Sequence, residues 1–119
     1  MIPGLSSAAH GQLHSFEHAL GLPLGEVGGA YVRYRRSAFR VTCHDRNSWT
    51  PEPDYDWRQD LDNARTMLEL AMRALSPKAR RQFQAMIDPL DAAYESWTLN
   101  NPFAPPELPW WLRRIGSLE

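Results

Sequence analysis

The sequence lacks the features that mark several common classes of protein. It holds a single cysteine, Cys43, so no disulfide can form within the chain. One free thiol is typical of a reducing compartment, and we expect a cytoplasmic protein. No run approaches the roughly 20 apolar residues that cross a bilayer, and the N-terminus does not resemble a signal peptide. We therefore expect no association with membranes.

An excess of charge of one sign is lacking too. The chain carries 13 Lys and Arg against 14 Asp and Glu, which gives a formal net charge of −1 at pH 7. This balance does not by itself indicate a nucleic-acid-binding protein. There is no Gly-rich phosphate loop, and no serine lies in a nucleophile-elbow motif. We therefore expect a non-enzymatic protein without a cofactor.

What is present is the composition of one globular domain. Hydrophobic residues make up 43% of the 119 residues, so we expect a single domain over residues 1–119 with a core built by packing alone. Residues 1–11 show no periodicity and are predicted to be frayed. Residues 12–21 are predicted to form a short helix, because Leu13, Phe16 and Leu20 share one face and Gly21 follows as a helix-ending glycine.

The strongest pattern lies in residues 56–98, which predict an antiparallel pair of helices. Apolar residues recur at spacings of four and three in two successive segments, as in packed helices. The first seam is Trp57, Leu61, Ala64, Leu68, Ala71 and Leu75, and the second is Ala79, Phe83, Met86, Leu90, Ala93 and Trp97. Ser76 and Pro77 separate the seams as N-cap and first helical residue. The second seam stays in register through Pro89, which predicts a kink there rather than an end. The fold class predicted is mainly α.

Residues 30–43 fit two conformations. As a helix, the segment places most of its arginines on one polar arc, with Tyr31, Tyr34, Ala38 and Val41 on the opposite side. As a strand, its apolar residues must change face midway. Gly28 and Gly29 at the entry and the strand-like composition of "FRVT" argue against a helix. We favour the helix and keep the strand as the alternative.

Arg33, Arg35, Arg36 and Arg40 form the only basic cluster that is interleaved with aromatic residues. A basic helix can lie in the major groove of DNA and neutralise phosphates. In outline, residues 16–36 also resemble a helix–turn–helix. A solvated surface helix explains the same residues, so a DNA-binding regulator is the alternative function.

A second alternative is a metal site. His10, His14 and His18 are spaced four apart, so on a helix they would form one stripe, and imidazoles one turn apart can share a metal ion. The competing interpretation is a solvated flank of a short helix.

Residues 101–114 combine four prolines with two adjacent tryptophans and two adjacent arginines. The prolines predict an extended, stiff strap that carries apolar side chains such as Phe103. Trp and Arg dominate the energetics of protein interfaces, so Trp110, Trp111, Arg113 and Arg114 are the predicted partner-binding residues. The favoured alternative is intramolecular, with the strap folded back over the open end of the hairpin where Trp57 and Trp97 are expected to meet. Adjacent residues of an extended strap point to opposite sides, which predicts one tryptophan docked on the core near Trp57 and Trp97 and one facing outward.

Residues 76–114 also resemble a family. The stretch "SPKARRQFQAMIDPLDAAYESWTLNNPFAPPELPWWLRR" is similar to the C-terminal part of small bacterial proteins of unknown function. They share a proline and basic helix start, a "PLD" step, a "TL–P" exit and an "LPWW-x-R" ending. The resemblance implies a shared structural unit and a bacterial source, and it implies no activity. The function predicted is a small interaction or regulatory module that binds a protein partner or forms a homodimer.

Overall fold

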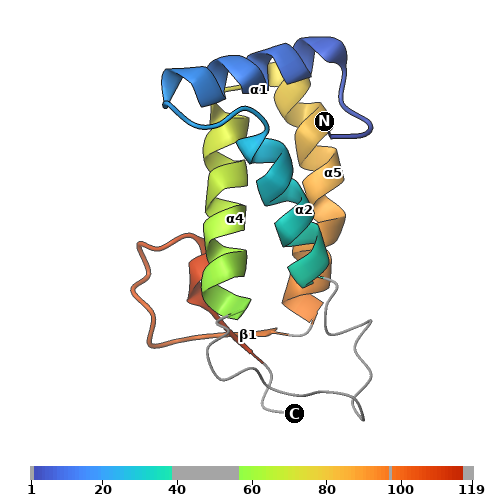
Figure 1. Ribbon diagram of the computed structural model, residues 1–119. Coiled ribbons are helices and arrows are strands. Elements are labelled where there is room, and N and C mark those ends of the chain that lie inside the picture. Colours follow the sequence, from blue (N-terminus) through green and yellow to red (C-terminus); the bar gives the residue numbers. More distant parts are fainter. Residues whose placement is uncertain (1, 39–56, 97, 117–119) are drawn as a thin grey trace.

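The computed structural model describes residues 2–38, 57–96 and 98–116, and within them helices dominate (Figure 1). Helices α2 (Glu26–Ala38), α4 (Trp57–Arg73) and α5 (Pro77–Ser96) lie side by side as a bundle. Helix α1 (Ser7–Ala19) crosses one end of the bundle. The C-terminal segment packs at the other end and beside α4. The fold is mainly α, as the sequence predicts, and no helix of these residues is long and apolar enough to span a membrane.

Helices α4 and α5 form the predicted antiparallel hairpin. Ser76 caps α5, because its Oγ accepts a hydrogen bond from the N–H of Ala79 at 3.4 Å. Arg80 closes the end of α4, since its guanidinium donates to the carbonyl oxygens of Met72 and Arg73 at 3.0 and 3.2 Å. Helix α5 runs unbroken through Pro89, which lies on its exposed side. The tight connection therefore satisfies the backbone groups that two adjoining helix ends leave free.

Helix α2 packs against both helices of the hairpin. Helix α4 is in closer contact with α2 than with its hairpin partner α5. The predicted helix over residues 30–43 is confirmed through Ala38, and residues 39–43 lie outside the described residues. Its aromatic residues reach α5, where the ring of Tyr31 lies 6.1 Å from that of Phe83 and Tyr34 meets Tyr94 edge to face at 6.4 Å.

Because of this packing, the buried face of α5 is wider than the predicted seam and is turned about the helix axis relative to it. Met86 and Ala93 of that seam are only half-buried, whereas Ile87 and Tyr94, which the seam omits, are fully buried. The physical reason is that α5 faces α2 as well as α4, so its apolar stripe is centred between two neighbours. The first predicted seam is buried from Leu61 to Ala71 on α4 and at Leu75 just after it. The side chains of Trp57 and Trp97 lie outside the described residues.

The N-terminal region corrects one expectation. Residues 1–11 are predicted to be frayed, but α1 begins at Ser7 and Ile2 is 2% exposed within the core. Ser6 caps the helix by accepting from the N–H of Ala9 at 3.1 Å. The anchor is a tertiary contact of Ile2, which local periodicity does not reveal. At the other end α1 terminates as predicted, with Gly21 at a φ of 68°, a conformation that favours glycine.

The turn from α1 to α2 is organised by a buried carboxylate. Glu17 is 2% exposed, and its two oxygens accept hydrogen bonds from the backbone N–H groups of Gly25 at 3.1 Å and Val27 at 2.8 Å. Charge at this position also complements the positive end of the α2 dipole. The carboxylate thereby fixes the angle between the two helices.

The C-terminal segment begins and ends in a short antiparallel ribbon. Strand β1 (Thr98–Asn100) pairs with β2 (Arg114–Gly116), with Leu99 opposite Ile115, and the 3₁₀ helix η2 (Trp110–Arg113) precedes β2. Between the strands, the backbone differs from the extended conformation predicted for residues 101–114. The N–H of Ala104 bonds to the carbonyl of Asn101 and that of Leu108 to the carbonyl of Pro105, each at 3.2 Å. The prolines at 102 and 106 occupy the second position of these turns, where their fixed φ favours turn formation.

Candidate interaction surface

The C-terminal segment is anchored on the bundle by Trp111. Its side chain is 5% exposed, its indole N–H donates to Thr66 Oγ1 at 3.0 Å, and the Arg65 guanidinium carbon lies 4.3 Å from its ring centroid. Trp110 is half-buried and meets Trp111 edge to face, with 6.0 Å between ring centroids. It also contacts Tyr94 at 6.0 Å. Because η2 is a tight helical turn, both rings lie against the bundle and neither points freely outward.

A buried polar network lies beneath Trp111. Arg65 is 3% exposed, and it donates to both carboxylate oxygens of Asp91, from Nε at 2.9 Å and from Nη2 at 3.1 Å. Its third donor, Nη1, reaches Glu69 Oε1 at 3.1 Å. The hydroxyl of Tyr34 donates to Asp91 Oδ1 at 2.5 Å. The Arg65–Asp91 pair therefore joins α2, α4 and α5, and the Arg65 guanidinium also lies over the Trp111 ring of η2.

The environment fixes the protonation state of this network. Burial raises the pKa of the Tyr34 phenol far above its ordinary value, and the negative charge of Asp91 raises it further. Burial opposes the charge on Arg65, but the hydrogen bonds and charge of Asp91 outweigh it, so the pKa of Arg65 is raised overall. The network therefore holds a neutral Tyr34 phenol beside a charged Arg65 guanidinium. The charged guanidinium attracts the face of the Trp111 ring that lies against it.

The two predicted arginines next to the tryptophans differ in their surroundings. The Arg114 guanidinium donates to Thr98 Oγ1 at 3.0 Å, to the Thr98 carbonyl at 2.8 Å and to the Glu95 carbonyl at 3.3 Å. It therefore closes the end of α5 and joins β1 to β2. Arg113 is half-buried, and its Nε has no hydrogen-bond partner in the part of the chain that the structure describes. Whether these four residues bind a partner stays a prediction.

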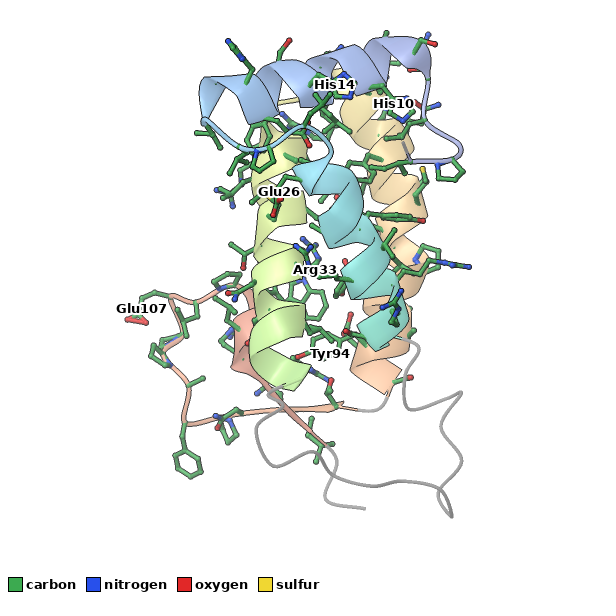
Figure 2. All side chains as sticks on the ribbon, viewed as in Figure 1. His10, His14, Glu26, Arg33, Tyr94 and Glu107 are labelled. Carbon is green, nitrogen blue, oxygen red and sulfur yellow. The ribbon has the colours of Figure 1, made fainter. Side chains whose placement is uncertain are left out.

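The outer part of the segment presents apolar side chains to solvent. We call residues 101–109 the strap. Phe103 is 94% exposed, the highest value of any large hydrophobic residue that the structure describes, and Leu99 at the base of the strap is 55% exposed. Figure 2 shows Glu107 at the outer edge of the strap, pointing away from the helices. The strap is thus a convex, solvent-facing element on a firmly seated base.

The basic cluster on α2 is only partly assembled. Arg35 and Arg36 are exposed, whereas Arg33 is half-buried beside Glu26, with 3.8 Å between Nη2 and Oε1 (Figure 2). Val32, which precedes Arg33 on α2, is 51% exposed. Arg40 lies outside the described residues. The structure therefore brings two of the four predicted arginines to one exposed stretch of helix.

Of the three histidines predicted as metal ligands, His10 is engaged in hydrogen bonds within the chain. His10 uses both ring nitrogens internally, because Nε2 accepts from the N–H of Ile2 at 3.1 Å and Nδ1 lies 3.0 Å from the carbonyl oxygen of Ser6. This pattern assigns the proton to Nδ1. His14 and His18 are exposed on α1. No group of three or more His, Cys, Asp or Glu that could hold a metal occurs among residues 2–38, 57–96 and 98–116. Cys43 and His44 lie outside this part.

No protein-family model, no curated protein and no solved structure matches this chain. The geometry of the site is therefore the basis for any statement about function. Arg65 and Asp91, on which the Trp111 ring is seated, are not among the residues predicted from the sequence. A signal was available, because each directly follows a predicted seam residue, Ala64 or Leu90. Charged residues that flank two facing seams commonly pair across them.

Proposed function

We propose that this chain is a small, non-enzymatic protein-interaction module that presents its C-terminal segment to a protein partner. The observation that supports this best is Phe103, a large aromatic side chain that is 94% exposed although its segment is anchored at both ends. An exposed aromatic residue contributes nothing to a monomer's core, whereas aromatic anchors dominate the energetics of interfaces. A cytoplasmic location and a bacterial source accompany this proposal.

The predicted partner-binding residues then have separate roles. Trp111 and Arg114 hold the segment in place, since the first is seated on Arg65 and the second joins the two strands. Trp110 and Arg113 are half-buried and lie at the margin of the surface, where they would contact a partner only after the outer residues have engaged. The exposed residues of the strap make the first contact.

The proposal is tested by photo-cross-linking in the cells that make the protein. A photoreactive phenylalanine analogue replaces one exposed apolar residue at a time, at Leu24, Val32, Leu70 and Phe103, which lie on different parts of the surface. We expect a discrete adduct from at least one position. If illumination yields no adduct at any of the four, the chain does not act as an interaction module.

The exposure of Arg35 and Arg36 supports DNA binding as a second candidate function. A gel-shift titration over a range of salt concentrations distinguishes the two candidates. Neutralised phosphates release counterions, so true binding weakens steeply as salt rises. Substituting Arg35→Ala and Arg36→Ala together should abolish the shift, and Lys78→Ala with Arg81→Ala, which removes two exposed positive charges from α5, is the matched control. Equal affinities for wild type and the double variant would eliminate this candidate.

A further inference from the structure

The strap carries a turn that fixes the backbone at Phe103. Asn101 makes three hydrogen bonds that define this turn. Its side-chain Oδ1 accepts from the N–H of Phe103 at 3.0 Å, its carbonyl accepts from Ala104 at 3.2 Å, and its own N–H donates to the carbonyl of Arg113 at 2.7 Å. Pro102, between Asn101 and Phe103, restricts the backbone further. Phe103, the most exposed large hydrophobic residue of the part that the structure describes, therefore sits on a closed, tethered turn.

Rigidity and exposure together indicate a preformed recognition element. Ordering a flexible side chain or loop at an interface opposes binding, and a preordered turn avoids most of that penalty. A folded monomer gains little from presenting a phenyl ring to water on an ordered backbone, because the ring buries almost no area there. The turn accordingly has the properties of an anchor that enters a partner without rearrangement.

The shape and charge of the strap indicate the kind of partner surface that receives it. A single protruding ring requires a concave, apolar pocket of about the size of one phenyl group. Glu107 is the only charged residue of the strap, and it is exposed and points outward (Figure 2). A pocket that receives this surface is favoured by a basic residue at its rim, because complementary charge steers and orients association.

We propose that the turn at residues 101–104 inserts Phe103 into an apolar, basic-rimmed pocket on a different protein. A second copy of this chain is the less favourable occupant, since a two-fold contact would place one convex turn against another. Stable interfaces bury about 800 Å² on each partner. Two copies that touch only through the turns at residues 101–104 bury less than this area. A turn that is enclosed by a pocket also brings the rest of the strap and its base into contact with the partner. This inference rests on the proposed function and names the residue and the partner surface.

The experiment uses the cross-linking panel with its adducts mapped by mass spectrometry. The inference predicts a discrete adduct from the analogue at position 103, joined to a residue that lines an apolar pocket of the captured protein. An adduct from Leu24, Val32 or Leu70 with none from position 103 overturns the inference and the presentation of the C-terminal segment, and it leaves standing only that the chain is an interaction module. No adduct at any position overturns both. An adduct of twice the chain's own mass identifies a second copy and overturns the inference.

Purified components then test the role of the turn. With the mapped protein, Phe103→Ala should weaken binding about 30-fold or more, which corresponds to loss of an interface hot spot. Asn101→Ala keeps the ring but removes the side-chain bond that holds it, and should weaken binding several-fold with an unchanged circular dichroism spectrum. Leu24→Ala, an equally conservative change at a residue that is 76% exposed, should leave the affinity unchanged. Equal affinities for the Phe103→Ala and Leu24→Ala variants overturn the inference.

Discussion

Trp111 and Phe103 belong to one C-terminal segment and have opposite environments. Trp111 is 5% exposed on a seat of charged side chains, whereas Phe103 is 94% exposed on a hydrogen-bonded turn. Both are aromatic, and a proline closely precedes each, so local sequence does not separate them. The difference is made by what lies opposite each ring, namely Arg65 and Thr66 for the first and solvent for the second.

The comparison shows how one segment can divide stability from recognition. The base contributes buried area and hydrogen bonds to the fold, so its residues are constrained by packing. The strap contributes little to folding, so its residues are free to suit a partner. Substitutions at the two places should accordingly have effects of different size and kind.

The largest effect is expected from Trp111→Ala. The change removes a buried ring and leaves Arg65 without the aromatic face that covers it, so we expect unfolding to become easier by about 3–5 kcal/mol. Urea denaturation followed by circular dichroism measures this free energy. Phe103→Ala is the matched aromatic control and should change it by no more than about 0.5 kcal/mol. Equal losses for the two variants would show that the base and the strap do not differ as described.

The next largest effect on stability is expected at the Arg65–Asp91 ion pair beneath Trp111. Asp91→Asn removes the charge that pairs with buried Arg65 and should lower the free energy of unfolding by about 3 kcal/mol, because a buried charge loses its partner. Asp88→Asn on the same helix is the control. Asp88 is exposed and accepts from Gln84 one turn away, so its substitution should change stability by about 0.5 kcal/mol or less. A small loss for Asp91→Asn would mean that the network positions Trp111 without stabilising the bundle.

A smaller effect, with a pH signature, is expected from Tyr34→Phe. Loss of the hydrogen bond to Asp91 should lower the free energy of unfolding by about 1.5 kcal/mol at pH 8. The pKa of Tyr34 is raised in the folded state, so its contribution is complete below the unfolded-state value of about 10 and is lost as pH rises above it. Urea denaturation between pH 8 and 12 should show this alkaline decline as steeper for wild type than for the variant. Parallel curves would contradict the burial of the phenol.

The smallest effect on folding is expected from Asn101→Ala in the strap. It removes one exposed side-chain hydrogen bond, so we expect a loss of about 0.5 kcal/mol. Amide hydrogen exchange should nevertheless become faster at Phe103, whose N–H is the donor in that bond. Exchange at Leu108, in the neighbouring turn, serves as the internal control and should not change.

Much of the helical architecture could be predicted from the sequence. The seams from Leu61 to Leu75 and from Ala79 to Leu90 established the hairpin, because helical spacing of apolar residues is a local property. Ser76 and Gly21 marked helix ends for the same reason, since capping depends on residues within one turn. For the candidate site, the sequence predicted one tryptophan on the core and one facing outward, whereas the structure places both rings against the bundle.

Only the tertiary structure decided how these pieces meet. Helix α2 packs between the hairpin helices and recentres the buried face of α5 on Ile87 and Tyr94, which no local pattern specifies. The pairing of Arg65 with Asp91 and the seating of Trp111 on that pair depend on the approach of three separate helices. Burial is a property of the assembled neighbours of a side chain rather than of its own sequence. For that reason Trp111 became part of the core and Phe103 remained in solvent.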